Sequence, residues 1–459
     1  MVSEPVTAPA CGRRPHPRDF GLFWAADSVS QFGTYVGNAL LPLLAATTLA
    51  ATPLEMGLLG AAETVGYLLI GLPAGVWVTQ LRQRHLMRRV NTGRALLLCT
   101  IPVAWWGGLL TVAQLIGVAL LCGVLAVLFD VAYQSHLPAL VRRDRLLQGN
   151  ARLQSSQSLA QITGPGVAGS LAQLAGPAYP VLATALGYLA SSLLLRRVRA
   201  PDPAARAKGA RPALLAEVRA GLGFVARSRT LLAITGCTAT ANFFTGVLGA
   251  VQVLFLTGVL GLAGSAAGAV MSVLGLGGVL GALSAYRVVR RVGQARAVWL
   301  VPVVTFPSLL LVPLAGRGVL LAPALAGLLL TGYGVVVYNV AQVSYRQTMC
   351  PPAMLARVNA TVRFIGFGAL TLGALAGGVF GEWAGIRGTL WIAALGTSLA
   401  GVWVVCSPLR GMRDFDAPGV DGAGGPAERE ARPAPGVGED LGDDGHRGLL
   451  RGRGADVQP

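Results

Sequence analysis

The sequence predicts an all-α polytopic membrane protein, with twelve transmembrane helices in two pseudo-symmetric six-helix bundles. The 459-residue chain is 53% hydrophobic and only 12% charged, which is not the composition of a soluble domain. Its apolar runs of 18 or more residues are long enough to cross the hydrocarbon as helices. Almost every Lys and Arg before residue 410 falls in the N-terminal segment or in every second connection. Loops rich in these residues stay in the cytoplasm.

The spans are read directly from the apolar runs. The first run is too long to be a signal peptide, so we expect an uncleaved first helix. An even number of spans returns the chain to its starting side, which predicts cytoplasmic N- and C-termini. Only Arg317 and Arg387 lie in the opposite loops. The predicted spans are 20–47, 54–78, 92–111, 113–135, 152–173, 178–196, 230–257, 262–286, 297–315, 318–345, 357–382 and 386–408.

Changes in composition divide the chain into five parts. The connection in the middle is rich in Pro and basic residues, and its stretch 214–226 is expected to form an amphipathic helix on the membrane surface. The last part is rich in Gly, Pro and charged residues and cannot bury a core. The predicted parts are a cytoplasmic N-terminus (1–19), an N-terminal six-helix bundle (20–196), a cytoplasmic linker (197–229), a C-terminal six-helix bundle (230–409) and a disordered cytoplasmic tail (410–459).

The two bundles are related by an internal repeat. Residues 130–176 align without gaps with residues 339–385. Asp130-Val131-Ala132 matches Asn339-Val340-Ala341, and three glycines keep the same register: Gly164, Gly169 and Gly176 match Gly373, Gly378 and Gly385. Duplicated halves suit a transporter that rocks around a central site.

Several function classes are excluded. The net charge of +17 does not indicate nucleic-acid binding, because the basic residues lie beside helix ends, where they meet anionic headgroups. The six cysteines are scattered without metal-ligand spacing, so no metal site is expected. No phosphate-binding loop and no nucleophile–base pair is visible. We therefore expect no enzyme activity and no cofactor, and an ion gradient, most simply of protons, as the energy source.

Three acids lie deep inside the predicted spans, whereas Glu55 and Glu382 fall at span ends near the outer surface. A charge inside the bilayer costs several kcal/mol by insertion scales and marks a functional candidate. Asp27 and Glu63 are candidates for proton coupling, although Glu63 can equally be a structural hydrogen-bonding residue. Asp130 is placed near the cytoplasmic end of its helix. There we expect it to form a latch with Arg82 or Arg84 that breaks when the transporter opens inward.

Polar residues recur on one face of the first span, at Asp27, Gln31, Thr34 and Asn38. Thr238, Asn242 and Thr245 repeat the first three positions in the seventh span. These side chains either bind a substrate or hydrogen-bond between helices.

Three segments give the chain a family resemblance. They are the run 71–78 with the basic loop after it, the run 129–138, and the Gly164-Pro165 pair with the residues to Gly169. With them the chain resembles the major facilitator superfamily over residues 20–409, and within it bacterial drug, macrolide and siderophore exporters. The loop motif of the family normally continues with Asp-Arg, where this chain has Thr79-Gln80.

The resemblance implies a central cavity lined by the first, fourth, seventh and tenth helices. It also implies that Gly164 and Pro165, which are similar to the Gly-Pro motif of antiporters, take part in gating. The candidates for the substrate cavity are Asp27, Gln31, Thr34, Tyr35, Asn38, Thr238, Asn242, Phe243, Thr245, Tyr338 and Asn339.

The function expected from these features is proton-coupled efflux of a small amphiphilic or cationic compound by alternating access. A proton-coupled importer and a membrane sensor or assembly protein without transport remain alternatives. The expected partners are the small-molecule substrate, protons and the lipid bilayer. We expect a monomer, located in the bacterial cytoplasmic membrane as a multi-pass protein.

Overall fold

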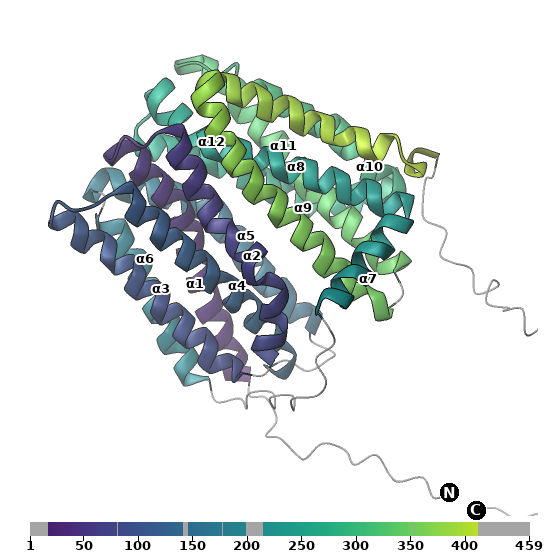
Figure 1. The fold of residues 1–459 in the computed structure, drawn as a ribbon, viewed down its shortest axis with the longest axis horizontal. Coiled ribbons are helices and arrows are strands. Elements are labelled where there is room, and N and C mark those ends of the chain that lie inside the picture. The colour runs from purple at the N-terminus through teal and green to yellow at the C-terminus, as the bar shows by residue number, and fades with distance from the viewer. Residues whose placement is uncertain are drawn as a thin grey trace, which may run out of the picture. The chain divides into compact units, whose positions relative to one another are not determined.

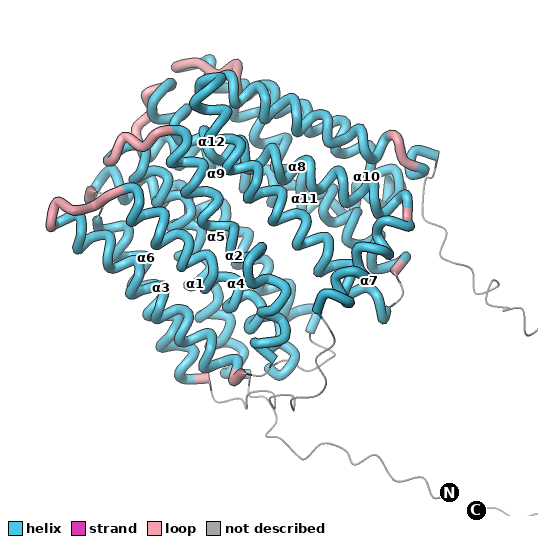
Figure 2. The backbone as a smooth tube through the Cα atoms, in the orientation of Figure 1, coloured by secondary structure: helices cyan, strands magenta, loops and turns pink. Residues whose placement is uncertain are grey.

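The computed structural model describes residues 17–79, 81–140, 146–176, 178–198, 214–350 and 352–411. Every regular element in these ranges is a helix, and the connections are short (Figures 1 and 2). The predicted N-terminal segment before Pro17, most of the predicted linker, and the predicted disordered tail after Gly411 lie outside the described residues.

The helices of the first half are α1 (Pro17–Thr48), α2 (Pro53–Thr79), α3 (Gln83–Trp106), α4 (Val112–Leu140), α5 (Leu146–Ala175) and α6 (Ala178–Arg197). A helix forms in the connection at the predicted place, α7 (Leu214–Arg227). The second half contains α8 (Arg229–Leu254), α9 (Gly264–Val292), α10 (Gln294–Thr305), α11 (Ala322–Met349) and α12 (Pro352–Val405), with the short helical segments η2 (Phe255–Val259), η3 (Phe306–Leu311), η4 (Gly318–Leu321) and η5 (Pro408–Gly411).

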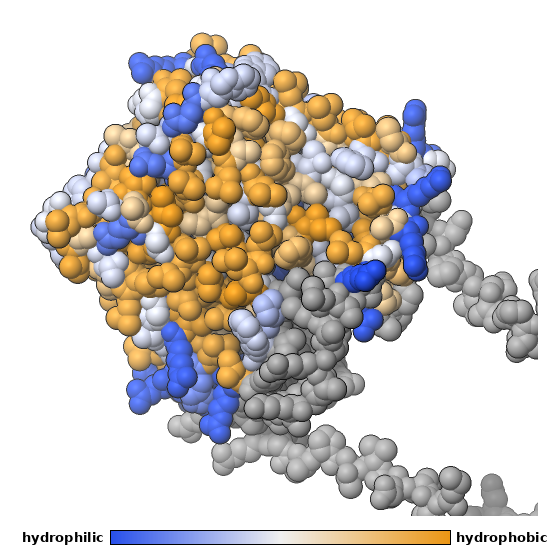
Figure 3. Space-filling model, viewed as in Figure 1, coloured by the Kyte–Doolittle hydropathy of each residue, from blue (hydrophilic) through white to orange (hydrophobic). Residues whose placement is uncertain are grey.

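The predicted all-helical membrane fold is confirmed. Within the described residues, eight helical stretches have the length and hydropathy needed to cross a membrane. One of them, Arg357–Val405, is interrupted at Gly385 and supplies two crossings. The polar helices α1, α3 and α5 complete the twelve; α3, for example, carries four arginines. Figure 3 shows apolar side chains over most of the visible face, with hydrophilic ones gathered towards its edges.

Several helices extend beyond the predicted spans. α4 continues to Leu140, and the first part of α12 begins at Pro352. The extra turns lie in the headgroup region and contain polar residues, so a prediction from apolar runs leaves them out. This corrects one expectation. Asp130 is ten residues, about 15 Å, from the end of α4, and so is not close to the end of its helix.

The glycines of the internal repeat occupy equivalent positions. Gly176 (φ 80°) ends α5 and Gly385 (φ 71°) interrupts α12, and both adopt the left-handed backbone that favours glycine. A Cβ on Gly164 would lie 2.8 Å from the side chain of Tyr35 in α1. Its repeat partner Gly373 packs in the same way on the backbone of α8 at Phe243. The two halves are thus built alike around their first helices.

The apolar core is also divided between the halves. Two clusters of buried residues come from α1–α6, apart from Val253 of α8. Two others come from α7 onwards.

The two halves meet along α2 with α12 and along α5 with α9. Gly57 of α2 approaches the first part of α12 so closely that a Cβ would lie 2.6 Å from the carbonyl oxygen of Ala374. The amide of Gly166 in α5 donates a hydrogen bond to Ser272 Oγ in α9 at 3.1 Å. These contacts begin at Pro53 in α2 and Gly264 in α9, the ends that the charge pattern places outside.

Candidate functional site

A cavity of about 390 Å³ lies between helices of both halves. Its walls come mainly from α1, α2 and α4, with Arg94 of α3, Gln157 of α5 and Tyr188 of α6. The second half contributes Arg363, Phe367 and Leu370, all from the first part of α12. The cavity is therefore the place where a bound molecule contacts both halves at once.

The α1 wall carries most of the predicted polar stripe. Gln31, Thr34, Tyr35 and Asn38 all line the cavity, because their spacing places them on one face of the helix. Thr34 shares a hydrogen bond with the hydroxyl of Tyr188 at 2.9 Å. The hydroxyl groups of this wall are thus held in place by side chains of neighbouring helices.

Four charged side chains line the cavity, namely Glu63, Arg94, Asp130 and Arg363. The charges of Arg94 and Arg363 both act on Asp130, which also accepts a hydrogen bond from the hydroxyl of Tyr67. Attraction between opposite charges is strong in a medium of low dielectric constant. Groups from α2, α3 and α12 therefore favour the ionised form of Asp130 and oppose the desolvation that its burial imposes.

Arg94 is held deep in the first half. Its side chain is 3% exposed, and its guanidinium lies 5.3 Å from the ring centre of Tyr188 and 5.7 Å from that of Phe129. Arginine stacks well on aromatic faces because its charge is delocalised over a plane. Its Nε has no hydrogen-bond partner among the described residues. The two rings thus take the place of part of the water that a charged group loses on burial, and the charge of Asp130 attracts the guanidinium from a greater distance.

Glu63 has no comparable partner. Its Oε1 atom is buried and without a hydrogen bond in the part of the chain that the structure describes. An ionised carboxylate in such a place pays a large desolvation cost. Glu63 can avoid that cost by binding a proton or by pairing with a positive charge that enters the cavity.

Tyr67 joins the charged group to the contact between the halves. Its hydroxyl binds Asp130 in the first half, while its ring stacks on Phe367 of α12 with the ring centres 3.9 Å apart and the planes 5° apart. One turn of α2 earlier, Thr64 and Thr371 share a hydrogen bond of 2.9 Å. A change at Asp130 therefore acts directly on a contact that holds the two halves together.

The other predicted residues lie outside the cavity lining. Asp27 is 3% exposed, accepts a hydrogen bond from Gln31 and lies within electrostatic range of Asp130. The predicted latch partners lie elsewhere in this conformation: Arg82 is exposed, and Arg84 donates to the carbonyl oxygen of Val198. Gly164 and Pro165 lie in α5, beside α1 and α9 respectively.

In the second half, the side chains of the predicted polar stripe form contacts with other residues of the same half. Thr238 shares a hydrogen bond of 3.1 Å with the hydroxyl of Tyr338, and Thr245 donates to the carbonyl oxygen of Ala241. Asn339 accepts a hydrogen bond from Gln342. The ring of Phe243 packs edge-on against Phe244, and Asn242 contacts the backbone at Gly366.

Sequence reasoning missed Tyr67, Arg94, Arg363 and Phe367. The two arginines were counted with the basic loops, although they lie just inside the predicted spans that begin at residues 92 and 357. In the structure each is the twelfth residue of its helix, α3 or α12. Four arginines along one helix were the signal that α3 begins well before its apolar part.

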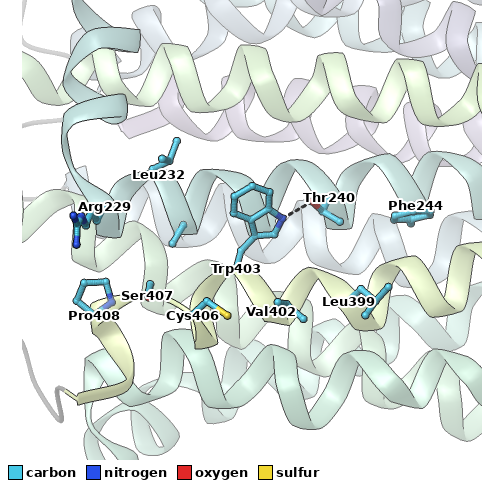
Figure 4. A pocket seen from close by; sticks show the side chains of 11 residues that line it. Arg229, Leu232, Thr240, Phe244, Leu399, Val402, Trp403, Cys406, Ser407 and Pro408 are labelled. Atoms are coloured by element: carbon cyan, nitrogen blue, oxygen red, sulfur yellow. Dashed lines mark hydrogen bonds between the residues drawn. The ribbon is translucent and has the colours of Figure 1, made fainter.

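A second, larger hollow of about 950 Å³ lies between α8 and the last part of α12. Figure 4 shows its mostly apolar lining. Its described lining includes no carboxylate, in contrast to that of the first cavity.

Comparison with known proteins agrees with this architecture. The profile of the family described as transmembrane secretion effector matches residues 16–427. No curated protein matches the chain. Similar solved structures include the nucleoside transporter NupG, which is 10% identical with a TM-score of 0.70 over 84% of this chain and 98% of that one.

A bacterial homologue of the iron transporter ferroportin in the inward-facing state is also similar, at 15% identity and a TM-score of 0.66, over 84% of this chain and 98% of that one. A POT family transporter in complex with a thioalcohol-conjugated peptide is 11% identical, with a TM-score of 0.66 over 85% of this chain and 96% of that one. At such identities the likeness shows the fold, which is that of major facilitator transporters.

Proposed function

The chain belongs to the transmembrane secretion effector family, and we propose that this multi-pass membrane transporter is a proton-coupled exporter of a small amphiphilic compound that carries a basic group. The observation that carries the proposal is the charged cavity between the halves, in which Oε1 of Glu63 has no hydrogen-bond partner among the described residues. The volume of about 390 Å³ suits a small molecule, since ligand pockets measure about 300–1,000 Å³.

Glu63 couples the substrate to the proton. When the cavity is empty, the buried carboxyl group holds a proton, because its ionised form has no partner. A basic group of the substrate pairs with the ionised form, so substrate and proton compete for the same carboxylate. A carrier that binds either one, but not both, exchanges them across the membrane.

Arg94 and Arg363 give Asp130 a different role. Asp130 keeps the hydrogen bond of the Tyr67 hydroxyl and the attraction of two guanidinium charges while Glu63 exchanges its partner. Its link through Tyr67 to Phe367 connects the occupancy of the cavity with the closure of the halves. Asp27 lies within electrostatic range of Asp130. It is a second carboxyl group that can bind a proton, and its protonation changes the electrostatic field at Asp130.

Export is supported by three features. The family description refers to secretion. The Gly164-Pro165 pair lies where α5 approaches α1 and α9, the place where an antiporter motif would affect rocking. The described contacts between the halves run from the predicted outer ends to the middle of α2, at Tyr67 and Phe367, which fits a state that loads substrate from the cytoplasm of a bacterium.

The proposal is tested by measuring the accumulation of dyes and antibiotics in a pump-deficient bacterial host that expresses the protein. We expect lower accumulation of one class of basic amphiphiles, restored by a protonophore and by Glu63→Gln. Glu55→Gln is a matched control, because Glu55 accepts the amide of Thr52 at the start of α2, where Gln serves equally well.

Two results would contradict the proposal. Lowered accumulation that the protonophore does not restore would show that protons are not the energy source. Raised accumulation of a compound would indicate import.

A further inference from the structure

The groove between α8 and the end of α12 has the composition of a lipid site. Its walls are apolar side chains of both helices, among them Leu399 (62% exposed) and Val402 (51% exposed). These residues face away from the interior of the bundle. In a membrane protein, a side chain exposed at this depth is covered by lipid.

The shape of the groove is fixed by Trp403. Its indole N–H donates a hydrogen bond to Thr240 Oγ1 at 3.1 Å (Figure 4). The ring lies over Gly236, where a Cβ would come within 2.7 Å of it. The glycine and the hydroxyl together hold the indole flat against α8, which leaves the space beside it open.

Positively charged side chains lie at one end of the groove. Arg229, the first residue of α8, is exposed and belongs to the lining. The elements α7 and η5, which contact α8, add the exposed residues Arg227 and Arg410. The described lining of the groove contains no carboxylate, and its arginines attract an anion to this end.

We propose that the groove binds one anionic phospholipid, with its phosphate at Arg229 and an acyl chain along Leu399 and Val402. An apolar channel with a cationic end matches a molecule that is apolar along its chain and negative at its head. Basic pockets between transmembrane helices on the cytoplasmic side bind anionic headgroups in this way. The site is separate from the charged cavity and does not depend on the direction of transport.

The test is native mass spectrometry of the purified full chain in detergent, mixed with equal amounts of dioleoyl phosphatidylglycerol and dioleoyl phosphatidylcholine. The wild type is expected to retain phosphatidylglycerol preferentially. Arg229→Gln should lower that preference about fivefold, the effect of one basic residue near the surface. The control Arg287→Gln should keep it, because Arg287 is exposed on α9 and does not line the groove.

A second variant tests the acyl-chain part. Val402→Trp fills the groove and should reduce retention of both lipids, while the unfolding temperature stays near that of the wild type because the position faces lipid. Equal preference in the wild type and Arg229→Gln would overturn the proposal. So would unchanged retention in Val402→Trp.

Discussion

The ring of Tyr67 in α2 stacks on the ring of Phe367 in α12, with their centres 3.9 Å apart. The hydroxyl of the same tyrosine donates a hydrogen bond to Asp130. One side chain therefore touches the charged cavity and the contact between the halves. In a transporter that rocks between two states, such a side chain is a physical connection between binding and closure.

Removing the hydroxyl separates these two roles. Tyr67→Phe keeps the stacked ring and loses the hydrogen bond to Asp130, which for a charged acceptor contributes about 1.5–3 kcal/mol. We expect transport to fall about tenfold or more, with the protein still folded and inserted. The measurement is the transport rate at equal membrane expression, with the separation of the halves followed by spin-label distances. Wild-type transport by Tyr67→Phe would show that the hydrogen bond carries no coupling.

Competition at Glu63 predicts a pH dependence of binding. A basic substrate has to displace the proton of Glu63, so its affinity should weaken as the pH falls, by at most about tenfold per pH unit for one proton. Glu63→Gln resembles the protonated form and should bind weakly, with no such dependence. Titration of the purified protein from roughly pH 6 to pH 8 measures this. Affinity that strengthens on acidification would indicate that proton and substrate bind together, as in an importer.

Arg94 tests the charge balance of the cavity. Arg94→Gln removes one of the two cations whose charge acts on the buried Asp130, and attraction between opposite charges is strong in a medium of low dielectric constant. Arg94→Lys keeps the charge but not the planar stacking on Tyr188 and Phe129. We expect a clear fall in the unfolding temperature for Gln, a smaller one for Lys, and none for Arg287→Gln at the surface. An unfolding temperature of Arg94→Gln equal to that of the control would contradict this role.

Gly57 tests the outer contact between the halves. A Cβ there would lie 2.6 Å from the carbonyl oxygen of Ala374, so Gly57→Ala should push α2 away from α12 and favour the outward-open state. Gly249→Ala is the matched control, because a Cβ at that position of α8 meets nothing within 4 Å. Labelling of single cysteines introduced into the cavity wall, from either side of the membrane, measures the shift. Identical labelling of the two variants would show that the contact does not close the outer side.

The features that the sequence predicted well are those that depend on local periodicity. The stripe of α1 places Gln31, Thr34 and Tyr35 on the cavity wall, because residues three and four apart share a helix face. The repeat matched Gly164 with Gly373, and in the structure these two glycines pack alike on α1 and α8. Such relationships need no knowledge of the packed neighbours.

The features that it missed depend on which helices meet. The stripe of α8 has the same pattern, but Thr238 is bound by Tyr338 of α11, a pairing set by packing within the second half. Nothing in the sequence distinguishes Phe367 from the many other aromatic residues of the spans. It becomes a site residue only because Tyr67 lies opposite to it.

The most direct test of the account measures proton movement itself. Everted membrane vesicles are acidified inside by respiration, and a pH-sensitive dye reports the gradient when a transported compound is added outside. Exchange of substrate for protons predicts that the compound raises the internal pH in wild-type vesicles and has no effect in vesicles with Glu63→Gln. If the vesicles take up the compound while the pH gradient stays unchanged, the protein does not exchange its substrate for protons.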